Sequence, residues 1–474
     1  MQPKHINEDL ETSKALLLPT LPRWWRVLPS VIIIAFITTI DSLTLNDLIE
    51  YRYANQYHKN SSSTQNSREL CLNDSSTSHL STISASTTTS KYSTTTTISP
   101  DDLVQESTAR LNVFISLAAT IPGILISILL GANCDRTGRK ALIVLPFIGK
   151  VIRYAILSAV VYFDLSDLWI IISVLFDSAC GTAGLSLLSY YAYVSDCTTE
   201  KNRTTGISTT EVVGVGSKFI PLLTMGVYLQ HPNFTQSMLI TLGLSLFGLL
   251  YSVFLQPESN LKVQHLNFFQ QLGQIKLRET TKMFRVFLVK REGHKQRSIL
   301  MLIFAHLSIV VMLLGYSSIN YLYLYGAPFC FDSFGVSLTT VAQTVTMIVL
   351  LVPCSLTVTK RSDHLFLAIV GCLFYISQLV LLGIAKRVWM VYLALCMGSV
   401  FFVLGPIVRA RVTKLVEPNE YALVFILASV FESGGGYAIN AMGNEIYRAS
   451  LLFFPGLTFF VFALFGCLAI LLLL

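Results

Sequence analysis

The chain has 474 residues, of which 53% are hydrophobic and 13% are charged, and its formal net charge is +7. Soluble globular proteins carry about 25% charged residues. Half that charge density, over many long apolar runs, excludes an ordinary soluble protein and predicts one that crosses the lipid bilayer several times. In such a protein the basic excess indicates cytoplasmic loops, so we expect no nucleic-acid partner.

Twelve segments are apolar enough and long enough, at about 20 residues, to cross a bilayer as helices. The sequence therefore predicts an all-α membrane protein with twelve transmembrane helices in two six-helix bundles, 27–256 and 298–474, separated by a cytoplasmic loop, 257–297. Such a layout is typical of carriers with a central cavity. The predicted spans are 27–47, 110–131, 141–163, 168–192, 206–229, 236–256, 298–320, 336–358, 363–385, 388–411, 420–443 and 450–474.

The distribution of Lys and Arg predicts the orientation. With the N-terminus (1–26) in the cytoplasm, the inner segments hold 23 of these residues and the outer segments hold 8. This bias fits the positive-inside rule. The first 23 residues are polar and carry no cleavage site, so the first apolar run is expected to be a transmembrane helix. Lys150, Arg153 and Lys218 lie within predicted helices, and the sequence assigns no role to Lys150 or Arg153.

The outer loop, 48–109, contains the sequons Asn60-Ser-Ser and Asn73-Asp-Ser, and both are predicted glycosylation sites. The Ser/Thr-rich tract 81–99 has too little apolar content to pack and is either a spacer or an O-glycosylated segment.

A short charged connection, "GANCDRTGRK" (131–140), separates the second and third helices. Gly131 permits close helix approach and Gly138 a tight turn with positive φ. Asp135 and Arg139 can form a charged pair across the bundle, with Arg136 and Lys140 beside them. The connection has the pattern G-x-x-x-D-R-x-G-R-K and resembles the signature loop of the major facilitator superfamily, which implies the major facilitator fold and alternating access. The alternative is a simple positive-inside anchor.

Acidic side chains inside predicted helices are costly in a bilayer and usually functional. Asp41, Asp177 and Glu432 are therefore candidates for the cavity lining. The central loop, 257–297, is a basic amphipathic helix on the inner leaflet or an ordinary basic linker.

Three further stretches narrow the family: "SDCTTEKNRTTGISTTE" (195–211), "APFCFDS" (327–333) and "GPIVRARVTKLVEPNEYALVF" (405–425). Each is similar to a motif of the proton-coupled folate transporter family. The resemblance implies proton coupling at Glu211 and substrate binding at Arg409. The alternative for Glu211 is a structural salt bridge, for instance with Lys218, and the alternative for Arg409 is an anchor at the inner interface, like Arg411 and Lys414. The resemblance also implies a disulfide between Cys71 and Cys330 on the outer face.

The chain departs from the family's folate carriers at Thr182 and Leu313, where they have an aspartate and a histidine. His306 lies two turns from Leu313 in the same predicted helix and could replace that histidine in proton coupling, although a lone histidine in a helix is more often a local hydrogen-bond partner.

These observations predict a proton-coupled symporter of a small organic anion, such as folate or a related conjugate, in the plasma membrane. The alternatives are a lysosomal exporter of a muropeptide, a cyclic dinucleotide or a conjugated anion, and a membrane receptor that does not transport. No nucleophile–base pair or metal-ligand spacing is found, so we expect neither an enzyme nor a cofactor, with protons as the coupling ion.

Overall fold

The computed structural model describes residues 23–60, 100–181, 183–198, 200–230, 232–278, 280, 295–326, 328–357, 364–404, 435–451 and 453–474, and these residues contain helices and no strand. Seven helices are long and apolar enough to cross a membrane, and four shorter apolar helices accompany them. The protein is thus an all-α membrane protein.

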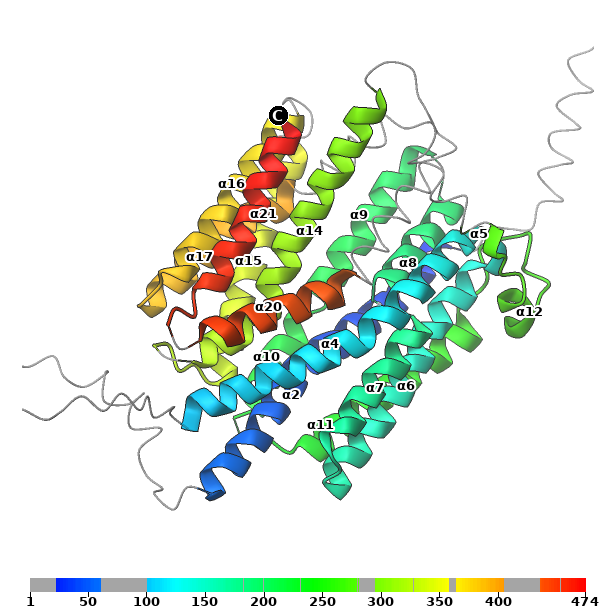
Figure 1. Cartoon of the computed structure of the whole chain (residues 1–474). Coiled ribbons are helices and arrows are strands. Elements are labelled where there is room, and N and C mark those ends of the chain that lie inside the picture. Colours follow the sequence, from blue (N-terminus) through cyan, green and yellow to red (C-terminus); the bar gives the residue numbers. More distant parts are fainter. Residues whose placement is uncertain are drawn as a thin grey trace, which may run out of the picture.

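The N-terminal helices form one group, which lies on one side of the molecule in Figure 1. They are η1 (Trp24–Val27), α2 (Leu28–Asn60), α4 (Pro100–Ala132), α5 (Cys134–Thr137), α6 (Arg139–Phe163), α7 (Asp167–Cys180), α8 (Ala183–Cys197), α9 (Glu200–Gly216), α10 (Phe219–Tyr228), α11 (Phe234–Leu250) and η2 (Tyr251–Leu255).

The C-terminal helices form the second group, after the short α12 (Phe268–Leu272), which packs on α5 and α6. They are α14 (Lys295–Tyr325), α15 (Ser333–Thr357), α16 (His364–Gly383), α17 (Val388–Leu404), α20 (Gly436–Ser450) and α21 (Leu457–Leu473). Each group has its own large cluster of buried apolar side chains. We call the two groups the N-half and the C-half.

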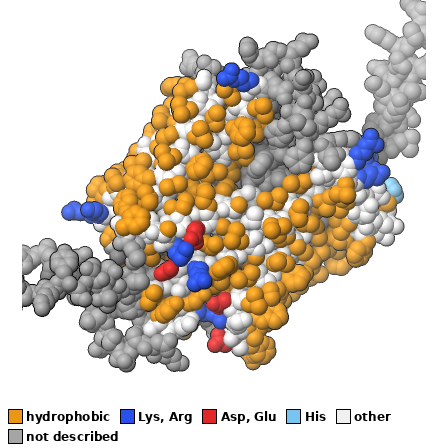
Figure 2. Space-filling model, viewed as in Figure 1, with side chains coloured by type: hydrophobic (Ala, Val, Ile, Leu, Met, Phe, Trp, Pro, Cys, Tyr) orange, Lys and Arg blue, Asp and Glu red, His pale blue; other side chains and the backbone are white. Residues whose placement is uncertain are grey.

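The outer face of the molecule is consistent with a lipid environment. Large hydrophobic side chains are exposed along α4, α7, α11 and α16. Figure 2 shows hydrophobic side chains spread over both halves on one face, with charged side chains in only a few places. Soluble proteins rarely expose apolar patches this extensive, so these surfaces are expected to face acyl chains.

Several helices differ from the prediction. Helix α4 begins at Pro100, ten residues before the predicted boundary, and the predicted span 206–229 is divided into α9 and α10. Helix α2 continues to Asn60, well past the predicted boundary at residue 47, because Leu48 and Ile49 are buried and Arg52 donates a hydrogen bond of 2.6 Å to the backbone oxygen of Leu165. The apolar run marks the membrane-spanning part of this helix rather than its length. The predicted span 168–192 is divided into α7 and α8 at Gly181, whose φ of +118° ends a helix.

The two halves meet along α10 with α15 and along α4 with α20. Three polar contacts join them near the end that leads to the predicted outer loop. Ser333 donates to Asp47 at 2.6 Å, Tyr447 donates to Gln105 at 3.1 Å, and Arg448 pairs with Glu106 at 3.3 Å.

Candidate functional site

The charged connection between α4 and α6 forms a compact site at the end of the N-half. Gly138 has φ of +80°, and this backbone conformation turns the chain from α5 into α6. A Cβ atom at this position would lie 2.5 Å from a carboxylate oxygen of Glu258. Glycine is therefore required both by the backbone conformation and by the space available.

Arg139 is the centre of this site, and its side chain is 10% exposed. Its guanidinium donates to Asp135 at 2.6 Å and to Asp196, at the end of α8, at 2.9 Å. Ser259 also donates to Asp196, at 3.1 Å. One guanidinium thus holds the α4–α6 connection against the end of α8, a geometry that suits the planar, multidentate arginine and not lysine.

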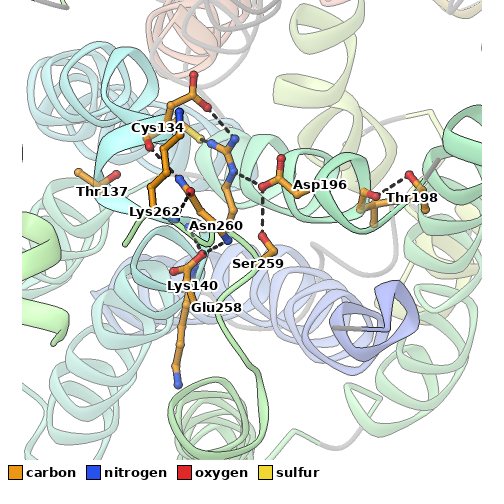
Figure 3. Close-up of polar contacts among 12 residues, drawn as sticks. Cys134, Thr137, Lys140, Asp196, Thr198, Glu258, Ser259, Asn260 and Lys262 are labelled. Carbon is orange, nitrogen blue, oxygen red and sulfur yellow. Dashed lines mark hydrogen bonds and ion pairs between the residues drawn. The ribbon is translucent and has the colours of Figure 1, made fainter. Parts of the chain in front are cut away.

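Glu258, which follows η2, completes the site. Its carboxylate accepts hydrogen bonds from the backbone amides of Arg139, at 2.9 Å, and Lys140, at 3.1 Å. These amides belong to the first turn of α6 and have no partner within the helix. A carboxylate here also interacts favourably with the helix dipole. Figure 3 shows Asp196 and Glu258 reaching the connection from different elements.

Cys134 lies next to Arg139, and its sulfur accepts a hydrogen bond from the guanidinium. Burial raises the pKa of the Cys134 thiol to about 11, although Arg139 acts in the opposite direction. The thiol is therefore neutral at physiological pH. We call Cys134, Asp135, Arg139, Asp196 and Glu258 the inner charge cluster.

A second group of charged side chains lies within the membrane-spanning part of the N-half. Asp177 of α7 accepts hydrogen bonds at one oxygen, Oδ2, from Lys150 at 2.7 Å and from Arg153 at 2.9 Å. Arg153 also pairs with Asp41 of α2 at 2.9 Å. We call Asp41, Lys150, Arg153 and Asp177 the membrane charge cluster.

Gly149 allows α6 and α7 to approach closely enough to form this cluster. A Cβ atom at Gly149 would lie 2.8 Å from Cβ of Cys180 and 3.1 Å from the backbone oxygen of Asp177. Lys150 and Arg153 are three residues apart and so share a helix face. The glycine and this spacing together bring both cations to Asp177.

The remaining predicted site residues lie in the same connection as the inner charge cluster, in other helices, or outside the described residues. Gly131 is buried at the end of α4, and Arg136 and Lys140 are half-buried in the connection. Glu211 belongs to α9, and His306 lies half-buried in α14. Arg409, Glu432, Cys71, Asn73 and the side chains of Glu211 and Asn60 lie outside the described residues. Cys330 is disulfide-bonded and has φ of +47°; its pairing with Cys71 stays a prediction.

Five residues of these clusters received no role from the sequence: Cys134, Lys150, Arg153, Asp196 and Glu258. Lys150 and Arg153 were noted only as cations within a predicted helix, although buried cations are as costly in a bilayer as acids. Glu258 gave no signal beyond its place after Pro257 at the end of a predicted span. Its two partners are more than one hundred residues away, and a single sequence does not reveal that proximity.

Comparison with known proteins identifies the family. The family profile described as the Major Facilitator Superfamily matches residues 80–439. The lysosomal proton-coupled steroid conjugate and bile acid symporter SLC46A3 of Gallus gallus is 25% identical over 366 residues, covering 76% of this chain and 78% of that protein. The proton-coupled folate transporter of Rattus norvegicus is 22% identical over 357 residues, covering 75% and 76%.

Solved structures show the same fold. The human organic anion transporter MFSD10 superposes with a TM-score of 0.61 at 15% identity, covering 96% of this chain and all of that one. The xylose transporter XylE of E. coli, in a partially occluded inward-open conformation, gives a TM-score of 0.61 at 13% identity, covering 94% and 96%. The predicted major facilitator fold is confirmed. The chain belongs to the Major Facilitator Superfamily, and its curated relatives include proton-coupled symporters of the folate transporter family.

Proposed function

We propose that the protein is a proton-coupled carrier of small organic anions that works by alternating access. The observation that carries this proposal is the inner charge cluster, in which Arg139 joins the α4–α6 connection to Asp196 while Glu258 caps α6. These contacts hold together three segments at one end of the N-half. A two-state arrangement of such contacts is what a gate requires.

In this proposal the inner charge cluster holds the inner end of the N-half together as one unit, because its described contacts all lie within that half. The charge-assisted contacts of Arg139 with Asp196 and of Glu258 with α6 contribute about 1.5–3 kcal/mol each. The contacts that would form in one conformation and break in the other, as the N-half and C-half rock against each other, are those between the halves, such as Asp47 with Ser333.

The relatives and the charged residues of the chain both support an anionic substrate and coupling to protons. The named substrates of the relatives, steroid conjugates, bile acids and folate, carry negative charge. Asp41 and Asp177 lie inside the N-half. We propose these two residues, together with Arg409 and Glu432, for the substrate site. Glu211 and His306 are proposed for proton coupling.

Two locations are compatible with this function. Plasma membrane import is the first proposal. Export from the lysosome is the second, and the names of the SLC46A3 relatives support it. Fractionation of cells that express the tagged chain decides between them, because the proposals differ in which organelle markers co-purify.

Uptake measurements test the proposed function. Cells with the chain at their surface should accumulate a labelled steroid sulfate, a bile acid or folate in a saturable way, and faster at pH 5.5 than at pH 7.4. Glu211→Gln should lose this pH dependence while still exchanging substrate. Arg409→Ala should raise the concentration for half-maximal uptake, and Arg411→Ala is its matched control. Uptake that does not depend on pH would contradict proton coupling. Binding without accumulation would support the alternative function, a membrane receptor that does not transport.

A further inference from the structure

The membrane charge cluster is balanced in charge. Two carboxylates, Asp41 and Asp177, face two cations, Lys150 and Arg153, and the four side chains come from three helices of the N-half. Isolated charges in a medium of low dielectric are very unfavourable, so a cluster there is stable only near zero net charge. The cluster as it stands meets this condition.

Its hydrogen bonding is incomplete, however. Within the described residues, Oδ1 of Asp177 and Nε of Arg153 are buried and have no hydrogen-bond partner. The side chains of these two residues are 3% and 7% exposed. Leaving such polar atoms without a partner costs free energy, and a structure that tolerates this cost at a charged group often uses the group for function.

The cluster also lies close to the other half of the molecule. Tyr437 of α20 packs against the buried core of the N-half and lies within electrostatic range of Asp177, Arg153 and Asp41. Lys150 and Asp41, at the two edges of the cluster, keep 12% and 15% of their side chains exposed. The titratable neighbours that face the two carboxylates are Lys150, Arg153, Tyr154, Cys180 and Tyr437.

We propose that the membrane charge cluster binds the transported anion and its coupled protons together, with Arg153 and Lys150 holding the anion and Asp177 taking the first proton. The number of protons bound equals the negative charge of the anion. This inference rests on the proposed function and deepens it, since it names the residues and the stoichiometry of coupling. In the bound state the first proton lies on Asp177; Glu211, proposed above for proton coupling, acts in the transfer of that proton and adds none to the stoichiometry.

The charge balance dictates this stoichiometry. An anion with one negative charge would bring the neutral cluster to −1, and one proton on Asp177 restores zero. The proton forms an O–H bond at the carboxylate, and no other covalent bond changes. Protonated Asp177 releases Lys150 and Arg153, and these cations donate to the oxygens of the anion. For an anion of charge −2, Asp41 takes a second proton. Its ion pair with Nη2 of Arg153 then breaks, and this nitrogen can also donate to the anion.

Proton uptake on ligand binding tests this inference directly. The full-length protein is purified in detergent, placed in weakly buffered solution at pH 6.5, and titrated with a steroid sulfate, a monoanion, or with folate, a dianion. We expect about one proton taken up for each steroid sulfate bound and about two for each folate. Linkage requires that lower pH strengthen binding by the same coupling.

Variants assign the roles. Arg153→Gln should weaken steroid sulfate binding about tenfold or more, and Arg153→Lys should recover part of the loss. Asp177→Asn should bind steroid sulfate at both pH 5.5 and pH 7.5 without taking up a proton, because the cluster already has one excess positive charge. If Asp177→Asn fails to fold, the double variant Lys150→Gln with Asp177→Asn restores neutrality. It should bind steroid sulfate with weakened affinity and take up one proton, on Asp41.

The exposed Arg387→Gln is the matched control for loss of an arginine, and it should bind like the unmodified protein. Binding by the unmodified protein without proton uptake would overturn the inference. So would Arg153→Gln with unchanged affinity, or Asp177→Asn with unchanged proton uptake. These outcomes leave the proposed function standing if pH-driven transport persists. Failure of the unmodified protein to bind or transport any of the anions would overturn both.

Discussion

Glu258 accepts a hydrogen bond from the backbone amide of Arg139 at 2.9 Å, across 119 positions of the chain. The same carboxylate holds the amide of Lys140, so the segment after η2 caps the first turn of α6. Arg139, whose amide is held in this way, directs its guanidinium toward Asp135 and Asp196. Glu258 therefore fixes the backbone of the inner charge cluster, and Arg139 forms its ion pairs.

Removing the cap should destabilise the protein. Glu258→Ala deprives the amides of Arg139 and Lys140 of a buried acceptor, which costs about 1–3 kcal/mol. We expect the melting temperature in detergent to fall by about 1–2 °C for each kcal/mol. Glu258→Gln keeps one acceptor oxygen and should show a smaller decrease. An unchanged melting temperature for Glu258→Ala would show that the cap contributes nothing.

The ion pair between Arg139 and Asp196 should show strong coupling in a double-mutant cycle. Arg139→Gln and Asp196→Asn each break the same contact, so the double variant should melt little below the less stable single variant. We expect a coupling of about 1–3 kcal/mol. Thermal unfolding of the four proteins measures it. Strictly additive effects on stability would mean that the pair is not an energetic unit.

Cys134 should report whether the inner charge cluster is intact. Its thiol is buried and its pKa is raised to about 11, so at pH 7.5 only about three molecules in ten thousand carry the reactive thiolate. Labelling by N-ethylmaleimide, followed by peptide mass spectrometry, should therefore be slow and should accelerate as pH rises.

Asp196→Asn should raise the rate of Cys134 labelling, because it removes a carboxylate that holds Arg139 over the thiol. Cys372, buried in the C-half, is the matched control and should label at the same rate in both proteins. If Cys134 labels rapidly in the unmodified protein, the contacts around Arg139 are open in solution.

Close packing of α6 against α7 should be essential to the membrane charge cluster. Gly149→Ala places a methyl group 2.8 Å from Cβ of Cys180, which forces the two helices apart. We expect a loss of stability of about 1–3 kcal/mol and a large loss of uptake. Gly243→Ala is the matched control, since nothing lies within 4 Å of the added carbon. Equal behaviour of the two variants would contradict the close approach.

The sequence predicts local features better than contacts between distant segments. The pattern of residues 131–140 predicted the turn at Gly138, whose φ of +80° is observed, because glycine and charge spacing are local properties. The length of the apolar run underestimated the length of α2. Beyond residue 47 this helix is stabilised by burial of Leu48 and Ile49 against other helices rather than by lipid. No single-sequence pattern could pair Glu258 with the amides of α6.

The membrane charge cluster illustrates the same limit. Asp41 and Asp177 were predicted as functional because acids are rare in membrane helices. The sequence showed that Lys150 and Arg153 lie within a predicted helix, but it did not show that they pair with these acids. That proximity depends on how α2, α6 and α7 pack. Gly149 permits the close approach of α6 and α7, and its role becomes clear only when the atoms around its missing side chain are known.

The most direct test of the account is uptake of a labelled steroid sulfate by purified protein in proteoliposomes with an acidic exterior and a neutral interior. The account predicts accumulation above the external concentration, lost when a protonophore collapses the gradient or when pH is equal on both sides. Equal uptake with and without the gradient, in vesicles that contain folded protein, would contradict proton-coupled anion transport.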